Sequence, residues 1–160
     1  MATARATSRG AADTERAAER VAARLAPGDV VLISGEVGVG KTTFVRAACR
    51  ALGVRERVTS PSFTIGHRYA GTFPISHVDL FRLDTLAGEE PGLLSDYLTD
   101  DAVAFVEWPE AASPEIEPQR VALDLRLWHR GGDTRGVQAE GHESLVEALT
   151  RALAPDTAAR

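Results

Sequence analysis

Apolar runs and amphipathic segments alternate along most of the chain. Residues 29–35 (DVVLISG) form a short apolar run rich in β-branched side chains, and residues 102–108 (AVAFVEW) form a second. Such runs are typical of strands buried on both faces of a parallel sheet. In residues 119–128 apolar side chains alternate with polar ones, which predicts a strand with one solvent-exposed face. Further strands are predicted at residues 63–69, 73–80 and 134–140.

Three other segments are predicted to be helices. Residues 13–25 carry apolar side chains at i, i+3 and i+4 spacing, and Asp13 or Thr14 can cap their first turn. Residues 42–53 follow a glycine-rich loop and end at a glycine, and residues 142–153 form the last helix. A strand, a glycine-rich loop and a helix in succession are the start of an α/β domain.

The predicted fold is an α/β P-loop NTPase sandwich of three layers. Its central sheet is mostly parallel, and antiparallel hairpin strands are added to it; the short loop at residues 70–72 joins one such hairpin. A single domain is expected over residues 11–154. Residues 1–10 have no apolar period and are expected to be a disordered N-terminal tail, and residues 155–160 a frayed C-terminal tail.

The composition limits the classes of function open to this chain. Acidic residues outnumber basic ones, 23 to 18, and the net charge is −5, whereas a protein that grips a nucleic-acid backbone usually has a basic surface. The single cysteine, Cys49, cannot form an internal disulfide. No apolar run is long enough to span a bilayer, and the first residues lack the apolar centre of a secretory signal. We therefore expect a cytoplasmic protein without membrane contact.

Residues 35–42 (GEVGVGKT) match the phosphate-binding motif G-x-x-x-x-G-K-[ST] at every fixed position, after an apolar strand and before a helix. Glycines let successive backbone N–H groups face a phosphate chain, and the helix N-terminus adds partial positive charge. Lys41, the only lysine among 18 basic residues, is expected to reach the β- and γ-phosphates, and the Thr42 hydroxyl to coordinate Mg²⁺. The expected ATP-binding residues are Gly35, Glu36, Val37, Gly38, Val39, Gly40, Lys41, Thr42 and Thr43.

Two acidic residues are candidates for the carboxylate that a P-loop protein holds near Mg²⁺, usually at the end of a neighbouring strand. Asp79 and Glu107 both end a predicted strand. Glu107 follows the more apolar one, so we assign it to Mg²⁺, and Asp79 is expected to orient the attacking water or to sense the γ-phosphate. The sequence leaves open which of the two is the main Mg²⁺ ligand. His77 shares a strand face with Asp79 and is expected to support the site or to pack in the core.

The segment Thr59–Ser60–Pro61 lies between the glycine-rich loop and these acids. Pro61 favours an extended conformation for Ser60. The hydroxyls are placed to meet Mg²⁺ or the γ-phosphate, as in a GTPase switch segment, or they belong to an ordinary loop that leads into a strand.

Four motifs together resemble, in order and spacing, those of the bacterial TsaE-type (YjeE-like) P-loop ATPases: GEVGVGKTTFVRA, VTSPSFTI, HVDLFRL and FVEWPE. The resemblance covers roughly residues 12–150. It implies a Mg²⁺-dependent ATPase, slow alone and stimulated by its partners, that is required for the threonylcarbamoyladenosine modification of tRNAs. Such an ATPase binds a TsaB–TsaD complex, hydrolyses ATP to sustain that complex's turnover, and meets tRNA only indirectly.

The resemblance also implies roles for individual residues. By matching motifs these are catalysis by Lys41 and Asp79, Mg²⁺ coordination by Thr42 and Glu107, and a switch-like segment of Thr59, Ser60 and Pro61. Trp108 and Thr14 would lie beside the nucleotide. The alternative for Trp108 is that it packs in the core, and the alternative for Thr14 is that it caps a helix.

Two other functions are compatible with the phosphate-binding motif. A small-molecule kinase usually needs a lid rich in arginine, but residues 81–99 hold one arginine, Arg82, and several acids. A binding module would change partners with ATP or ADP and need no catalysis. Guanine specificity usually rests on an Asn-Lys-x-Asp motif, and this chain contains no asparagine, so ATP is the predicted nucleotide.

Overall fold

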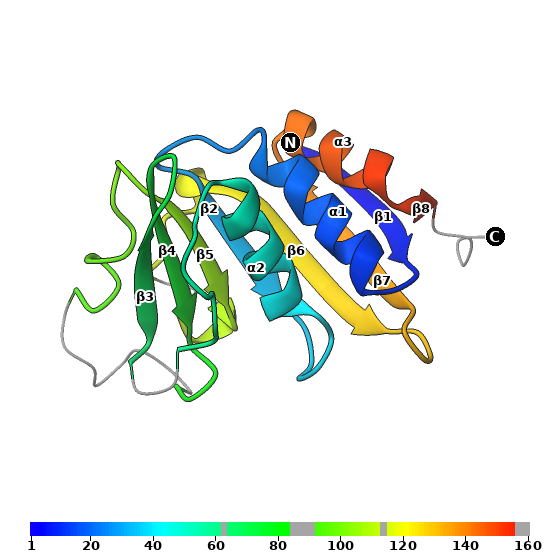
Figure 1. The fold of residues 1–160 in the computed structure, drawn as a ribbon, viewed down its shortest axis with the longest axis horizontal. Helices are drawn as coiled ribbons and strands as arrows, with labels where there is room; N and C mark the ends of the chain where they lie inside the picture. Colours follow the sequence, from blue (N-terminus) through cyan, green and yellow to red (C-terminus); the bar gives the residue numbers. More distant parts are fainter. Residues whose placement is uncertain (62–63, 84–91, 113–114, 156–160) are drawn as a thin grey trace.

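One eight-stranded sheet, in the order β3-β4-β5-β2-β6-β7-β1-β8, organises the computed structural model over the residues that it describes, 1–61, 64–83, 92–112 and 115–155 (Figure 1). The strands are β1 (Ala2–Ser8), β2 (Val30–Ser34), β3 (Gly66–Ala70), β4 (Pro74–Asp79), β5 (Val103–Glu107), β6 (Val121–His129), β7 (Arg135–Gly141) and β8 (Ala154–Pro155). The α-helices are α1 (Ala11–Ala22), α2 (Lys41–Ala51) and α3 (Glu143–Ala152), and the 3-10 helices are η1 (Pro109–Ala112) and η2 (Pro118–Arg120).

The four central strands are parallel, because β5 pairs in parallel with β4 and with β2, and β2 pairs in parallel with β6. The outer pairs β3–β4, β6–β7, β7–β1 and β1–β8 are antiparallel. This arrangement confirms the predicted α/β fold, with a mostly parallel centre and antiparallel strands added to it. It also brings the carboxyl ends of β2, β4 and β5 to one edge of the sheet, where ligands bind in open α/β sheets.

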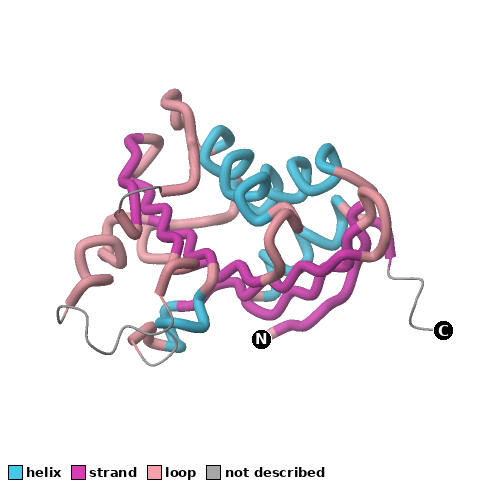
Figure 2. The backbone as a smooth tube through the Cα atoms, turned by 90° about the horizontal axis from the view of Figure 1, so that it is seen from below, coloured by secondary structure: helices cyan, strands magenta, loops and turns pink. Residues whose placement is uncertain are grey.

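The two faces of the sheet are covered differently. The three α-helices pack on one face, through a core that includes Val21, Phe44 and Phe105 (Figure 2). On the other face, η1 and residues 92–98 cover β2, β4 and β5, and they bury Leu94 and Ala112. Farther along this face, β6 alternates buried and exposed residues as its sequence predicts.

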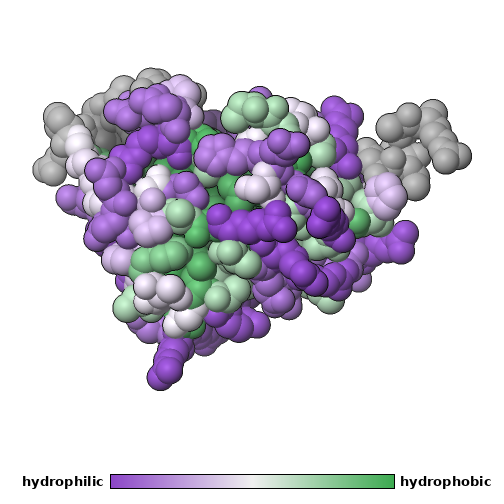
Figure 3. Space-filling view, turned by 90° about the horizontal axis from the view of Figure 1, so that it is seen from above, coloured by the Kyte–Doolittle hydropathy of each residue, from purple (hydrophilic) through white to green (hydrophobic). Residues whose placement is uncertain are grey.

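Hydrophilic residues predominate on the surface shown in Figure 3, and hydrophobic residues reach it in a narrow band between them. Among the described helices, none combines the length and the hydropathy that crossing a membrane requires. Apart from Met1 at the N-terminus, two large apolar side chains of the described residues are exposed: Val37 by 68% and Phe81 by 58%. Both line the pocket described below.

The prediction of a disordered tail at residues 1–10 is wrong. Residues 2–8 form β1, which pairs with β7 over its whole length, from Ala2 opposite Gly141 to Ser8 opposite Arg135. The small and polar side chains of this segment gave no apolar signal, because its position depends on backbone pairing and on the burial of a few small residues. In the predicted C-terminal tail, Pro155 belongs to β8, and residues 156–160 lie outside the described part of the chain.

The first helix also begins earlier than predicted, at Ala11, and neither Asp13 nor Thr14 caps it. Gly10 is the N-cap residue, so no side-chain hydrogen bond caps the start of this helix. Asp13 instead accepts a hydrogen bond from the Arg9 backbone N–H at 2.9 Å, and Thr14 shares a buried hydrogen bond with Ser8 at 2.7 Å. These polar side chains therefore tie β1 to α1.

Gly141, the last residue of β7, lies too close to β6 for a side chain. A Cβ there would stand 2.2 Å from the Ala122 carbonyl oxygen and 2.9 Å from Leu123 Cα. Because both atoms belong to the backbone, Gly141→Ala must push the strands apart, and we expect it to lower the free energy of unfolding by about 2 kcal/mol or more. Denaturant titration measures this loss.

Gly10→Ala is the control for this substitution. The Gly10 backbone is extended, and a Cβ there would meet nothing within 4 Å. We expect its free energy of unfolding to stay within about 0.5 kcal/mol of the wild type. Equal stability of the two variants would contradict the close approach of β7 to β6.

Candidate functional site

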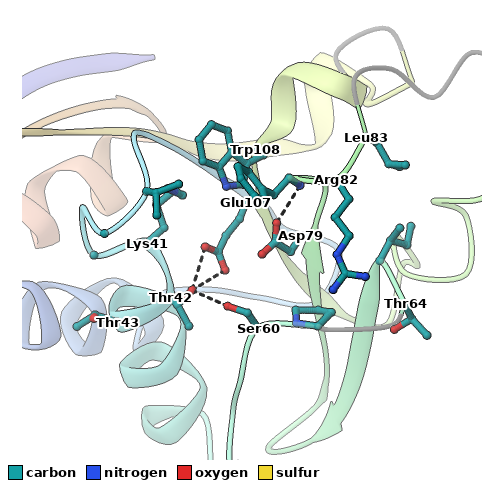
Figure 4. A pocket seen from close by; sticks show the side chains of 16 residues that line it. Lys41, Thr42, Thr43, Ser60, Thr64, Asp79, Arg82, Leu83, Glu107 and Trp108 are labelled. Carbon is teal, nitrogen blue, oxygen red and sulfur yellow. Dashed lines mark hydrogen bonds between the residues drawn. The ribbon is translucent and has the colours of Figure 1, made fainter.

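A pocket of about 720 Å³ lies where the carboxyl ends of β4 and β5 meet the N-terminus of α2 (Figure 4). The sheet register explains which residues enter it. Asp79 at the end of β4 is opposite Glu107 at the end of β5, and Glu107 is opposite Ile33 of β2. The two predicted acids therefore lie side by side, next to the loop that follows β2.

The glycine-rich loop joins β2 to α2 in a conformation that depends on two of its glycines. Gly40 is the N-cap of α2 and has a left-handed backbone, with φ of 110°. At Gly35, with φ of 146°, a Cβ would stand 2.5 Å from the Leu127 carbonyl oxygen of β6. Only glycine meets both demands without strain, so these two positions fix the path of the loop and the direction in which α2 starts.

Lys41 is the first residue of α2, and its side chain folds back into the loop. Its Nζ donates hydrogen bonds to the carbonyl oxygens of Gly35 at 2.6 Å and Glu36 at 2.9 Å. Burial lowers the pKa of this ammonium, and the negative charges of Glu107 and Asp79 oppose that shift. The loop thus holds a single cation at its centre.

Trp108 closes one side of the pocket. It follows β5 directly and has φ of 55°, a left-handed backbone that is rare for a large side chain and that is often found at functional sites. This backbone places its ring 4.4 Å from Lys41 Nζ, within the range of a cation–π interaction. The ring of Phe81 lies against the indole, with 5.0 Å between the ring centroids.

The Thr42 hydroxyl and the Glu107 carboxylate lie next to each other at the floor of the pocket. The Thr42 hydroxyl lies 3.1 Å from Glu107 Oε1 and 3.2 Å from Oε2, and it shares a hydrogen bond with the Ser60 hydroxyl at 3.0 Å (Figure 4). Behind Glu107, His77 Nε2 lies 2.5 Å from Oε2. Glu107 is thus held between a hydroxyl of α2 and an imidazole of β4.

Asp79 faces the same pocket from β4. Its carboxylate accepts a hydrogen bond from the Phe81 backbone N–H at 3.0 Å. Burial raises the pKa of Asp79 above its ordinary value, and the neighbouring Glu107 carboxylate raises it further, whereas the Phe81 hydrogen bond lowers it. A carboxylate in this setting is a better proton acceptor than an exposed aspartate.

The pocket brings together most of the residues that the sequence singled out. Its lining includes Val37, Gly38, Gly40, Lys41, Thr42, Thr43, Ser60, Pro61, Asp79, Glu107 and Trp108. Gly35 and Glu36 contribute carbonyl oxygens to Lys41, whereas the side chain of Val39 is buried in the core. Thr59 and Thr14 do not line the pocket.

Several residues at the site were not assigned to it from the sequence. Arg135 Nε donates to the Val39 carbonyl oxygen at 3.2 Å, and His129 Nε2 lies 3.4 Å from the Val37 carbonyl oxygen. Both belong to the β6–β7 hairpin, and only the pairing of distant strands places them beside the glycine-rich loop. Arg82 adds a second basic side chain to the pocket lining, and its position shortly after Asp79 was the available signal.

Other chemistries find little support. Cys49 is buried, and burial raises the pKa of its thiol to about 12, so the thiolate that a nucleophile or a metal ligand needs is disfavoured. Within the described ranges, no group of three or more His, Cys, Asp or Glu residues could hold a metal ion. Mg²⁺ does not require one, because it is usually bound by one or two carboxylates together with substrate phosphates. Residues 84–91, in the region where a kinase lid would lie, are outside the described chain.

The comparisons with known proteins agree on one family. The family model for "Threonylcarbamoyl adenosine biosynthesis protein TsaE" matches residues 8–137. A Bacillus subtilis protein named "tRNA threonylcarbamoyladenosine biosynthesis protein TsaE" is 32% identical over 144 residues, which cover 87% of this chain and 89% of that one. A Streptomyces coelicolor protein of the same name is 42% identical over 118 residues, 72% of this chain and 78% of its own.

A solved structure shows the same fold. The crystal structure of Bacillus subtilis YdiB superposes with a TM-score of 0.74 and 28% sequence identity, and the match covers 94% of this chain and 95% of that one. The family model extends over most of the chain, and it includes the glycine-rich loop and both acids at the strand ends. The chain therefore belongs to the TsaE family, which acts in the biosynthesis of threonylcarbamoyladenosine in tRNA.

Proposed function

We propose that this protein is a Mg²⁺-dependent ATPase that works with a TsaB–TsaD pair in the threonylcarbamoyladenosine modification of tRNA. One observation carries the proposal: the Thr42 hydroxyl and the Glu107 carboxylate meet at the N-terminus of α2, behind a glycine-rich loop that holds Lys41. Membership of the TsaE family supports the pathway.

The loop and α2 have the parts needed to hold a triphosphate. The backbone N–H groups at the start of α2 have no partners within the helix, and the helix dipole adds positive charge there. Lys41 supplies a compact ammonium and Arg82 a second cation in the pocket lining. The exposed ring of Phe81 and the partly buried ring of Trp108 offer an apolar wall beside the pocket.

The Thr42 hydroxyl and the Glu107 carboxylate fit Mg²⁺, because hard oxygen donors are the ligands that this ion prefers. Glu107 is 2% exposed, and a carboxylate is retained at such depth when it is paired or when it binds a cation. Thr42 and Glu107 would hold the ion, and the chemistry that it would supply is positive charge against the negative charge of the transferred phosphoryl group.

Asp79 is the residue that we assign to the attacking water. Its raised pKa suits a general base, because a carboxylate with a higher pKa accepts a proton more readily. Its hydrogen bond from Phe81 fixes the side chain and leaves the second carboxylate oxygen for a water molecule. Lys41 would meanwhile stabilise the negative charge on the phosphate chain.

Partner proteins account for the link to tRNA. The net charge of −5 disfavours a strong direct grip on a nucleic-acid backbone, so contact with tRNA would run through the TsaB–TsaD pair. The exposed side chains of Val37 and Phe81, at the pocket, are available for a protein partner to cover.

The test is Mg-ATP hydrolysis by the protein alone and after addition of a TsaB–TsaD pair from the same source. We expect a low rate that rises by an order of magnitude or more on mixing. Glu107→Gln should remove the rise, whereas Glu147→Gln on the surface of α3 should leave it unchanged. If the rate does not change when the partners are added, the proposed role in the pathway is refuted. If Glu107→Gln does not change the rate, the metal site is refuted.

A further inference from the structure

His77 lies in the middle of β4 and is fully buried, with 0% of its side chain exposed. Its Nε2 is 2.5 Å from Glu107 Oε2. The other ring nitrogen, Nδ1, has no hydrogen-bond partner among the described residues. Among the described residues, Glu107 is therefore the one hydrogen-bond partner of this imidazole.

The sheet register explains why His77 points at Glu107. His77 is opposite Phe105 on the parallel neighbour β5, and Asp79 is opposite Glu107. Side chains two residues apart on a strand share a face, so all four project toward α2. Glu107 is the diagonal neighbour of His77, within reach of a long side chain. The same face thus carries Asp79 at the pocket and His77 one step deeper.

The energetics argue against plain packing. Burying a polar group without compensation is costly, and an apolar residue at this depth would avoid that cost. What the imidazole provides is one hydrogen bond, and the acceptor is the carboxylate at the floor of the pocket.

We propose that His77 is a positioning residue for the metal site: Nε2–H donates to Glu107 Oε2, and this bond holds the carboxylate in the orientation in which it faces Thr42 and would bind Mg²⁺. The inference rests on the proposed function, because it takes Glu107 as a Mg²⁺ ligand. Partners that orient a metal-binding carboxylate from behind usually affect metal affinity strongly. Thr42 contacts the same carboxylate from the pocket side, with its hydroxyl 3.1 Å from Oε1 and 3.2 Å from Oε2.

Two amide substitutions of nearly equal chemistry test this role. In His77→Gln the amide nitrogen can stand near the position of Nε2 and donate to Glu107. In His77→Asn the side chain is one methylene shorter, and the amide ends near Nδ1, out of reach of the carboxylate. The measured quantities are the Mg²⁺ concentration for half-maximal ATP hydrolysis and, separately, nucleotide affinity without metal.

We expect His77→Asn to raise the half-maximal Mg²⁺ concentration by about tenfold or more, and His77→Gln to stay within about threefold of the wild type. Affinity for the nucleotide without metal should be unchanged in both. Ser76→Ala is the control, because Ser76 is also fully buried in β4 and its hydroxyl has no described partner, yet it lies on the opposite face. Thermal unfolding verifies that each variant is folded.

The outcomes separate this inference from the proposed function. A folded His77→Asn with the wild-type Mg²⁺ requirement, while Glu107→Gln alters that requirement, would overturn the role of His77 alone. If Glu107→Gln leaves the Mg²⁺ requirement unchanged, the metal site itself is wrong, and the role of His77 is refuted with it. Should His77→Asn fail to fold, His77→Leu takes its place, since leucine fills the volume and offers no donor.

Discussion

Lys41→Ala is expected to weaken nucleotide binding by about 100-fold or more, which corresponds to about 2.7 kcal/mol, while the fold stays intact. Lys41 is the only lysine of the chain, and its ammonium lies at the centre of the glycine-rich loop, where it donates to two loop carbonyl groups. Alanine removes the cation and leaves those two carbonyl oxygens without their donor. Titration with a fluorescent ATP analogue measures the loss, and circular dichroism on heating checks the fold.

Lys41→Arg separates the charge of Lys41 from its shape. Arginine keeps the positive charge, but its planar fork is broader than an ammonium. The space around Lys41 Nζ is bounded by two carbonyl oxygens and by the Trp108 ring at 4.4 Å. We therefore expect Lys41→Arg to bind nucleotide poorly as well. Arg50→Ala, at the exposed C-terminal end of α2, is the control, and wild-type affinity in Lys41→Ala would disprove the phosphate-binding role.

Asp79→Asn is expected to slow hydrolysis by at least about 100-fold and to preserve binding. Asparagine keeps an oxygen that can accept the Phe81 N–H bond, so the turn after β4 should survive, but it cannot accept a proton from water. Loss of a general base typically costs a factor of about 100 to 10,000 in rate. We expect the single-turnover rate to fall within that range, and ATP affinity to stay within about threefold of the wild type.

Asp124→Asn serves as the matched control for Asp79→Asn. Asp124 lies on β6 outside the pocket, and its pKa is also raised, by desolvation and by Glu140 and Glu110. The substitution should leave the hydrolysis rate unchanged. If Asp79→Asn hydrolyses ATP at the wild-type rate, the catalytic assignment of Asp79 is wrong.

The same variant distinguishes an ATPase from a nucleotide-switched binding module. A module that only changes partners with ATP or ADP should support threonylcarbamoyladenosine formation with Asp79→Asn as it does with the wild type. An ATPase that sustains the turnover of its partners should not. The measurement is multiple-turnover modification of tRNA in a reconstituted mixture, with the variant in place of the wild type.

The parts of the site that the sequence predicts are those set by local spacing. The glycine-rich loop and Lys41 are fixed by consecutive residues, and Asp79 and Glu107 are found because each ends an apolar run. Their meeting in one pocket follows from the parallel pairing of β4 and β5, which the apolar pattern already favoured. Local chemistry and fold class were therefore sufficient for the centre of the site.

The contacts that support the site were beyond the reach of the sequence, because they depend on register between distant strands. A shift of one residue between β4 and β5 would turn His77 away from Glu107. Arg135 and His129 contact the loop only because β7 returns antiparallel to β6. β1 was not predicted for a related reason. Its alanines and threonines have no apolar period, and its partner β7 is more than half the chain away in sequence.

The position of β1 has a consequence for the order in which the molecule is assembled. β1 is the first strand of the chain, yet it lies between β7 and β8, which are among the last elements. During synthesis on the ribosome, residues 2–8 must wait for residues 135–141 before they find their place, whereas β2, α2 and the parallel centre can form earlier. We therefore expect the pairing of β1 with β7 to be a late step in the completion of the sheet.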